Sequence, residues 1–279
     1  MSECHGIDIS RLRVGENRIA CPKCCGESKK RNLSVNVQAD GHAIWHCHRC
    51  LWDGATGGPS NAPKRPVQAT KATMKPRALS AYGLSIWNAA MALAGPARAY
   101  LEARACLLPP ADGHLRFLPV LGHPCGYKGP ALVALVTDAL SAEPISLHRT
   151  WIRPDGSKAP VDLPRLLLKD HSKAGGVIRL WQKDCATSCL GIAEGIETAL
   201  SLAHGMTPAW ACIDAGNLAA FPLIDGVDQL VIAADNDPTG RNAAATCAER
   251  WTLSGRKVRI VTAEYAGSDL NDEVRGWPT

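Results

Sequence analysis

This 279-residue sequence lacks several features, and each absence narrows what the protein can be. No uninterrupted apolar run approaches the roughly 18 residues that a membrane-spanning helix needs. The N-terminal segment, with Glu3 and Asp8, does not have the pattern of a secretory signal peptide. No G-x-x-x-x-G-K-[ST] motif occurs, so a P-loop motor is not expected. We therefore expect a cytoplasmic protein that does not contact a membrane.

Disulfide bonds are not expected either, although the sequence has 12 cysteines. Without a secretory signal, a disulfide framework has no oxidising compartment in which to form. Eight of the cysteines are scattered, and most of these suit small buried apolar positions. The other four form two C-x-x-C pairs, Cys21 with Cys24 and Cys47 with Cys50, separated by 22 residues. Two pairs with the same internal spacing indicate a metal site.

The segment between the two pairs predicts a hairpin that brings them together. Residues 33–37 alternate apolar and polar side chains, and Asp40-Gly41 is a hairpin signal. Four thiolates in tetrahedral geometry select Zn²⁺. A segment of about 50 residues with so small a core needs the metal in order to fold. We therefore predict a small β zinc ribbon over residues 1–54, with one structural Zn²⁺ per chain.

Neighbouring residues leave the ligand set open. Cys25, His46 and His48 could each replace one of the four cysteines. His48 and Arg49 fall in the exposed turn between the two cysteines of the second pair. Two interpretations of that turn stay open, a contact with nucleic acid and a solvated polar tip.

Charge is distributed unevenly along the chain. The net charge is +5, but residues 190–279 carry six Lys and Arg against twelve Asp and Glu, a net of −6, which leaves +11 for residues 1–189. This asymmetry suits a protein that holds a polyanion with one part and metal ions with another, with chance asymmetry of solvated surfaces as the alternative. Residues 55–80 have no acidic residue and are rich in Gly, Pro and Lys, so we expect a flexible basic linker.

Residues 81–186 predict an α+β domain of basic character. Two helices come first, with Tyr100 among their expected core residues, and an antiparallel sheet with a hairpin follows. We regard Arg149, Lys158 and Lys169 as candidates for binding nucleic acid or nucleotides. Ordinary surface charge is the alternative for each of them.

Residues 187–279 alternate strand and helix patterns, which predicts an α/β fold with a parallel sheet and helices on both faces. Acidic residues follow the expected strand ends: Glu194, then Asp235 and Asp237, then Asp269. Working groups collect at the carboxyl ends of the strands in such sheets. Because hard divalent cations take oxygen ligands, these four carboxylates predict a catalytic site for Mg²⁺ or Mn²⁺.

Other charged residues nearby have alternative explanations. Glu197 is better explained as a favourable first-turn acid of the helix that follows Glu194. Asp272 and Glu273 are placed for helix capping and are second-choice metal ligands. Arg241 lies at the start of the helix after Asp237, where a phosphate contact and an ordinary surface position are both open.

The acidic segments and their order resemble a Toprim domain: Glu194–Ser201 (EGIETALS), Asp235–Gly240 (DNDPTG) and Ser268–Asp272 (SDLND). The N-terminal ribbon resembles the zinc-binding domain of DnaG-type primases, particularly the variants of phages, plasmids and other mobile elements. Residues 147–158 also look like the segment that precedes Toprim in these proteins. Two positions depart from the pattern, since Thr198 stands where many bacterial primases have a further Asp, and Ser268 replaces the usual basic residue.

The resemblance implies a DNA primase that makes short RNA primers on a single-stranded DNA template from ribonucleoside triphosphates. Glu194 would be the general acid or base at the 3′-oxygen and, with Asp235, Asp237 and Asp269, would hold the Mg²⁺ or Mn²⁺ ions of a two-metal reaction. Any helicase would be a separate partner. The alternatives are a Toprim-type metal-dependent nuclease and a non-catalytic zinc-ribbon DNA-binding protein.

Overall fold

The computed structural model describes residues 3–4, 6–24, 32–38, 40–47, 50, 52–56 and 78–276. The chain divides into two compact units, residues 1–72 and residues 73–279. Most of the expected linker lies outside the described residues, and the domain boundaries at residues 54, 80 and 186 stay predictions. Within the described part of the chain, no helix has both the length and the apolar character that a membrane crossing requires.

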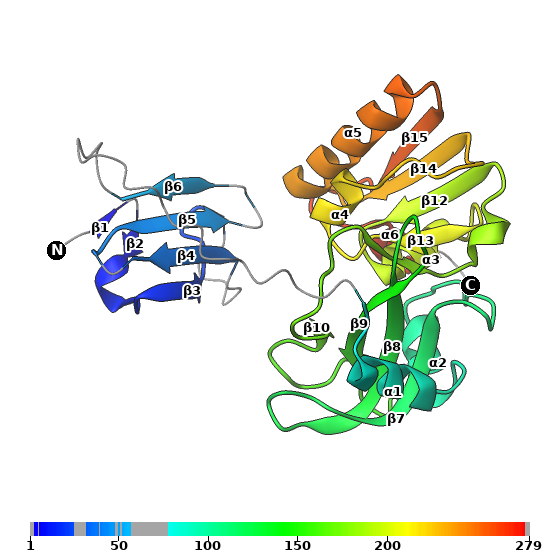
Figure 1. Ribbon diagram of the computed structural model, residues 1–279, viewed down its shortest axis with the longest axis horizontal. Helices are drawn as coiled ribbons and strands as arrows, with labels where there is room; N and C mark the ends of the chain where they lie inside the picture. The colour runs from blue at the N-terminus through cyan, green and yellow to red at the C-terminus, as the bar shows by residue number, and fades with distance from the viewer. Residues whose placement is uncertain are drawn as a thin grey trace. The chain divides into compact units, whose positions relative to one another are not determined.

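The first unit contains a four-stranded antiparallel sheet in the order β3-β4-β5-β6 (Figure 1). Its elements are β1 (Glu3–Cys4), β2 (Ile7–Asp8), the 3-10 turn η1 (Ile9–Arg11), β3 (Gly15–Ile19), β4 (Leu33–Val37), β5 (Ala43–Cys47) and β6 (Asp53–Ala55). The predicted hairpin is confirmed, because Leu33 lies opposite Cys47 and Val37 opposite Ala43. Alternation along the strands turns Leu33 and Trp45 to one buried face.

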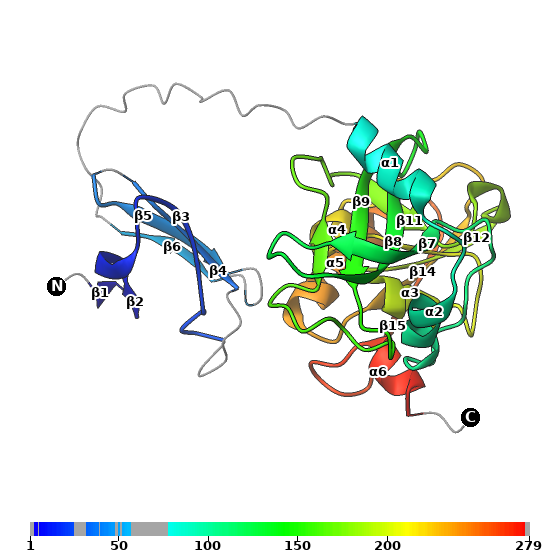
Figure 2. The same ribbon diagram turned by 90° about the horizontal axis from the view of Figure 1, so that it is seen from below.

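The second unit is built on a nine-stranded sheet with an antiparallel and a parallel half (Figures 1 and 2). The antiparallel half contains β7 (Leu115–Gly122), β8 (Lys128–Asp138), β9 (Pro144–Trp151) and β10 (Arg165–Leu167). The parallel half contains β12 (Cys189–Ala193), β13 (Ala209–Ala211), β14 (Gln229–Ala234) and β15 (Lys257–Thr262). β11 (Gly176–Arg179) joins the halves, because it pairs with both β8 and β13. Both predicted sheets are therefore confirmed.

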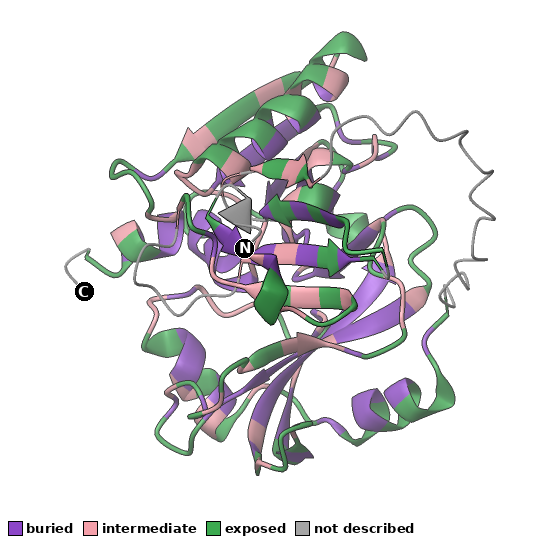
Figure 3. Cartoon of the chain, turned by 90° about the vertical axis from the view of Figure 1, so that its left-hand side faces the viewer, coloured by how far each residue is buried: buried purple, intermediate pink, exposed green. Residues whose placement is uncertain are grey.

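Helices cover both faces of this sheet, as expected for an α/β fold. On the parallel half, α4 (Ala215–Ala219) and α5 (Pro238–Leu253) pack on one face, and α3 (Ile196–Leu202) and α6 (Leu270–Val274) on the other. On the antiparallel half, α1 (Ala81–Ala89) and α2 (Gly95–Glu102) pack on opposite faces, and the 3-10 turn η2 (Lys183–Cys185) precedes β12. Figure 3 shows these elements with buried purple faces and exposed green faces.

One hydrophobic core spans the two halves of the sheet. Side chains of α2, α3 and α6 belong to the same buried cluster, which includes Tyr100, Leu200 and Leu270. The joint core brings α2 against α3, although their contacting residues lie far apart in the sequence. A site at the end of the parallel strands can therefore take side chains from both halves.

Candidate functional site

The four cysteines of the two C-x-x-C pairs meet in the first unit. Their Sγ atoms all lie within 4.8 Å of one another. Cys21 Sγ is 3.7 Å from Cys50 Sγ, and Cys24 Sγ is 3.6 Å from Cys47 Sγ. Zn–S bonds of about 2.3 Å in a tetrahedron place neighbouring sulfurs roughly 3.8 Å apart. The donor atoms and their spacing therefore fit one zinc ion.

The local backbone geometry explains how Cys47 and Cys50 are placed in this cluster. Cys47 ends β5, and its backbone N–H donates to the carbonyl of Trp52 at 2.8 Å. The backbone N–H of Cys50 points to Cys47 Sγ at 3.5 Å, so the turn directs a donor at the sulfur. The alternative ligand His46 is exposed, because it faces away from Cys47 along the strand. The alternative ligands Cys25 and His48, and the nucleic-acid-binding candidate Arg49, lie outside the described residues.

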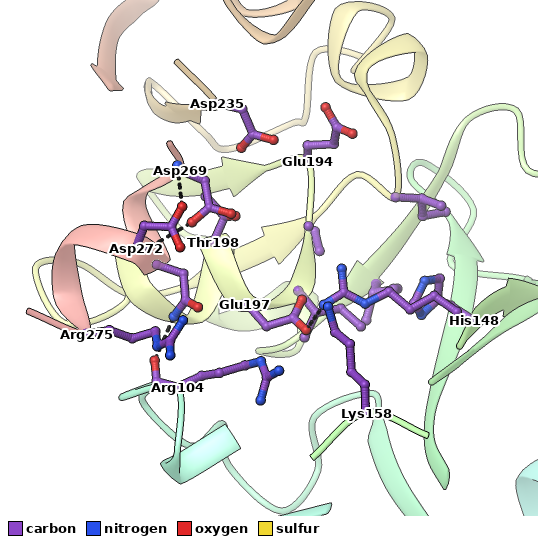
Figure 4. A pocket seen from close by; sticks show the side chains of 17 residues that line it. Arg104, His148, Lys158, Glu194, Glu197, Thr198, Asp235, Asp269, Asp272 and Arg275 are labelled. Carbon is purple, nitrogen blue, oxygen red and sulfur yellow. Dashed lines mark hydrogen bonds and ion pairs between the residues drawn. The ribbon is translucent and has the colours of Figure 1, made fainter. Parts of the chain in front are cut away.

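A pocket of about 320 Å³ opens in the second unit, where β12 and β14 end and α6 begins (Figure 4). Glu194 directly follows β12, and Asp235 directly follows β14. These strands are parallel neighbours, so their carboxyl ends meet at one edge of the sheet. Asp269, the N-cap residue of α6, lines the same pocket. The fold thus brings together three of the four predicted carboxylates.

The fourth carboxylate, Asp237, has a different position. It caps α5 by accepting a hydrogen bond from the backbone N–H of Gly240 at 2.8 Å, and it does not line the pocket. Of the second-choice ligands, Asp272 lines the pocket and shares a capping box with Asp269, whereas Glu273 does not line it. Asp237, which the sequence predicted as a metal ligand, therefore serves as the N-cap of α5.

Burial and mutual repulsion dominate the electrostatics of the acidic side. Burial raises the pKa of Glu194 to about 7, and the charge of Asp235 adds to the rise. Burial raises the pKa of Asp235 to about 6, and the charge of Asp269 adds to it. Oδ1 of Asp235 is buried and has no hydrogen-bond partner among the described residues. A divalent cation would supply that partner and remove the repulsion, so the donor set fits Mg²⁺ or Mn²⁺.

The carboxylates are less closely assembled than the cysteines. Across the described ranges, the four cysteines form the one group in which three or more possible ligand atoms lie within 4.8 Å of one another. Mg²⁺ usually keeps several waters and takes further oxygen ligands from a bound phosphate. The acidic side therefore resembles a site that a substrate completes.

The opposite side of the pocket is basic. Four cationic side chains line it: Arg104, Lys158, Arg165 and Arg275. Figure 4 shows the labelled members of this group away from Glu194 and Asp235. His148 also lines the pocket, and burial lowers its pKa to about 4, so its ring is uncharged at neutral pH. Carboxylates facing cations suit a ligand that carries metal ions on one side and phosphates on the other.

The predicted basic residues have diverging positions. Lys158 lines the pocket, where burial and the neighbouring Arg165 lower its pKa. Lys169 and Arg241 are exposed and do not line it. Arg241 donates a hydrogen bond to Asn236 Oδ1 at 2.6 Å. The structure therefore brings one of these three residues to the acidic site.

Arg149 requires a correction, because it packs in the core. Its guanidinium donates to the carbonyl of Leu167 at 3.0 Å and lies 5.0 Å from the ring centroid of Trp151. Neighbouring residues of a strand point to opposite faces, so His148 reaches the pocket while Arg149 packs on the other face. Its burial argues against the predicted contact with nucleic acid.

Sequence reasoning missed a partly buried ion pair in the pocket wall. Glu197, expected only as a first-turn acid, is 9% exposed and accepts hydrogen bonds from the Tyr100 hydroxyl and the Arg165 guanidinium. Burial alone would raise the pKa of Glu197, but the Arg165 charge and the Tyr100 hydrogen bond outweigh it and lower that pKa. The three residues come from α2, β10 and α3, so no local pattern could have revealed them.

Comparison with family models gives two matches. Residues 189–276 match the model of the Toprim domain. This part of the chain is a Toprim domain. Residues 77–180 match a domain of unknown function, DUF7146. The Toprim domain contributes the carboxylates of the pocket, and the DUF7146 region contributes Arg104, Lys158 and Arg165, so the pocket lies between the two.

The chain is also similar to two solved structures. A DNA primase domain from Pseudomonas aeruginosa is 17% identical with a TM-score of 0.38, over 57% of this chain and 52% of that chain. This chain thus spans about half of that domain's length. The primase fragment of the bacteriophage T7 primase-helicase protein is 16% identical with a TM-score of 0.43, over 93% of this chain and 98% of that chain. None of the curated proteins matches the sequence.

Proposed function

We propose that this protein is a DNA primase that synthesises short RNA primers on single-stranded DNA by two-metal nucleotidyl transfer. The observation that carries the proposal is the pocket between the Toprim domain and the DUF7146 region, where three predicted catalytic carboxylates face four cations. The reaction needs carboxylates to hold divalent ions and cations to bind a triphosphate. The cysteine cluster, which fits zinc, supports the zinc ribbon expected in a primase.

The pocket residues have distinct roles in this proposal. Asp235 and Asp269 would hold Mg²⁺ or Mn²⁺, and Asp237 would contribute negative charge from the N-cap position of α5. Divalent ions held there would supply the charge that activates the attacking hydroxyl and stabilises the transferred phosphorus. Glu194 moves the proton at the 3′-oxygen. Its pKa of about 7 suits a group that both takes and gives a proton near neutral pH.

The remaining parts of the chain would bind the template. The zinc ribbon of residues 1–54, with His48 and Arg49, would contact single-stranded DNA. The basic linker of residues 55–80 would add attraction to phosphates that does not depend on sequence.

Primer synthesis by the purified protein tests the proposal. With Mg²⁺ or Mn²⁺, single-stranded DNA and the four ribonucleoside triphosphates, we expect short oligonucleotide products. Glu194→Gln and Asp235→Asn should each lower the rate at least about a hundredfold, because each removes a charge that acts in the transition state. Asp228→Asn, at the other end of β14, is the matched control and should keep full activity.

The same assay separates the alternatives. Cleavage of the DNA without synthesis would replace the primase by a Toprim-type nuclease. Binding of DNA without either reaction would indicate a non-catalytic zinc-ribbon protein. Synthesis that survives Glu194→Gln and Asp235→Asn would remove these carboxylates from the reaction and overturn the roles given to them.

A further inference from the structure

The partly buried ion pair in the pocket wall holds one edge of the Arg165 guanidinium. Nη2 of Arg165 donates to the carboxylate of Glu197 and, at 3.0 Å, to the hydroxyl of Tyr100. The Tyr100 hydroxyl donates in turn to the same Glu197 carboxylate. Tyr100 is fully buried and Glu197 is 9% exposed. Both partners are therefore held by the core, and Arg165 is held by them.

The remaining N–H donors of the Arg165 guanidinium are available to a ligand in the pocket. An arginine has five N–H donors, and the two on Nη2 are used by Glu197 and Tyr100. Among the described residues, neither Nε nor Nη1 of Arg165 has a hydrogen-bond partner. The Arg165 side chain is 38% exposed and lines the pocket. Three N–H donors in a fixed plane are suited to the oxygens of a phosphate.

Tyr100 also orders a second cation of the same wall. The guanidinium of Arg104 lies 3.8 Å from the Tyr100 ring centroid, and its Nη1 donates to the Tyr100 carbonyl at 3.2 Å. Glu197 offsets one of the four positive charges of the wall by pairing with Arg165. The wall therefore keeps a net positive charge while one of its arginines is held in a single orientation.

We propose that Glu197 and Tyr100 are positioning residues that hold Arg165 ready to bind the triphosphate of the incoming nucleotide. The proposal rests on the proposed function for the identity of that ligand. A triphosphate is favoured over the template backbone because Arg165 shares one pocket with Glu194 and Asp235, and a polyphosphate can reach metal ions and cations together. Preorganisation strengthens binding, because the side chain loses less freedom when the ligand arrives.

Binding of inorganic triphosphate to the full chain, in the presence of Mg²⁺, tests the role of Arg165 without any need for catalysis. Arg165→Ala should weaken binding about tenfold to a hundredfold, as expected for the loss of charge-assisted hydrogen bonds. Arg165→Lys should recover only part of the affinity, since an ammonium cannot form the same planar contacts. Arg98→Ala is the matched control, because this exposed arginine of α2 pairs with Glu102 at 2.7 Å and does not line the pocket.

A double-mutant cycle tests whether Tyr100 acts through Arg165. Tyr100→Phe keeps the ring and removes only the hydroxyl, and it should weaken triphosphate binding about fivefold in the unaltered protein but have no effect in Arg165→Ala. Glu197→Gln should behave in the same way. A purely structural role would lower the melting temperature without this dependence on Arg165.

Other outcomes overturn the proposal. Unchanged triphosphate affinity in Arg165→Ala would remove Arg165 from phosphate binding, and equal effects of Tyr100→Phe in both backgrounds would remove its positioning role. Loss of single-stranded DNA affinity with unchanged triphosphate affinity would assign Arg165 to the template. If the unaltered protein binds triphosphate as expected but makes no primers, the proposed function fails while the inference about Arg165 stands.

Discussion

The cysteine cluster and the acidic pocket are both candidate metal sites, but the fold builds them in different ways. The four Sγ atoms already lie within 4.8 Å of one another, whereas the carboxylates line a pocket of about 320 Å³ without such close approach. A structural zinc site takes all of its ligands from the protein. A magnesium site that serves a reaction leaves positions for water and phosphate. The comparison suggests one metal that maintains a fold and others that arrive with a substrate.

The strongest test of this contrast is Cys47→Ser, which should abolish zinc binding and unfold the first unit. Zinc contributes about 10–16 kcal/mol of apparent binding free energy in small zinc domains, which the core of this unit cannot replace. Elemental analysis should give one zinc per unaltered chain and almost none in the variant, with rapid proteolysis before residue 57. Cys185→Ser, at an exposed cysteine, should change neither measurement. A variant that keeps its zinc would exclude Cys47 as a ligand.

For the acidic pocket we expect the opposite behaviour, because Asp235→Asn should stabilise the metal-free protein. The folded pKa of Asp235 is about 6, above its ordinary value of 3.8, so its ionised form opposes folding and stability falls as pH rises through this window. After discounting for solvent screening, the gain at pH 8 should be about 1 kcal/mol. The same variant should lose most of the rise in melting temperature that Mg²⁺ produces.

Thermal unfolding with and without Mg²⁺ measures both effects of Asp235→Asn. Asp228→Asn at the far end of β14 is the control and should leave the Mg²⁺ response unchanged. An equal Mg²⁺ response in Asp235→Asn and the unaltered protein would show that the ion binds elsewhere.

Glu197 and Glu194 lie three residues apart and should respond to pH with opposite sign. Arg165 and Tyr100 lower the pKa of Glu197 despite its burial, so its contribution is present above the unfolded pKa of about 4.3 and is lost as pH falls through the folded value. Glu197→Gln should therefore destabilise the protein by about 1–3 kcal/mol at pH 7, and the difference should shrink in acid. Urea unfolding at pH 7 and pH 3 measures it, with the exposed Glu102→Gln as control.

The smallest effects are expected at the exposed basic residues. Lys169→Ala and Arg241→Ala should change the free energy of unfolding by less than about 0.5 kcal/mol and leave triphosphate binding unchanged, because neither residue lines the pocket. If either residue contacts template phosphates, its replacement should make the slope of log DNA affinity against log salt concentration shallower by about one. A large loss of triphosphate affinity in either variant would move the nucleotide out of the pocket described above.

Residue spacing in the sequence was sufficient to predict the features that depend on regular strand pairing. Two C-x-x-C pairs joined by a hairpin converge because antiparallel pairing places Leu33 opposite Cys47. Glu194 and Asp235 meet because each directly follows a parallel strand, and such strands end at one edge of the sheet. These arrangements follow from local pattern and regular pairing, so they were open to prediction before any packing was known.

Tertiary packing decided which side chains face the pocket. Asp237 caps α5 instead of lining the pocket, and Arg149 packs in the core while its neighbour His148 lines the cavity. Tyr100 was expected in the core and lies there, but its hydroxyl meets a carboxylate 97 residues away. The sequence by itself determined the strands, their acidic ends and the cysteine pairs, because these depend on periodicity. Only the packing of α2 against α3 produced the wall of the pocket, because hydrogen bonds between distant residues depend on how whole elements are placed.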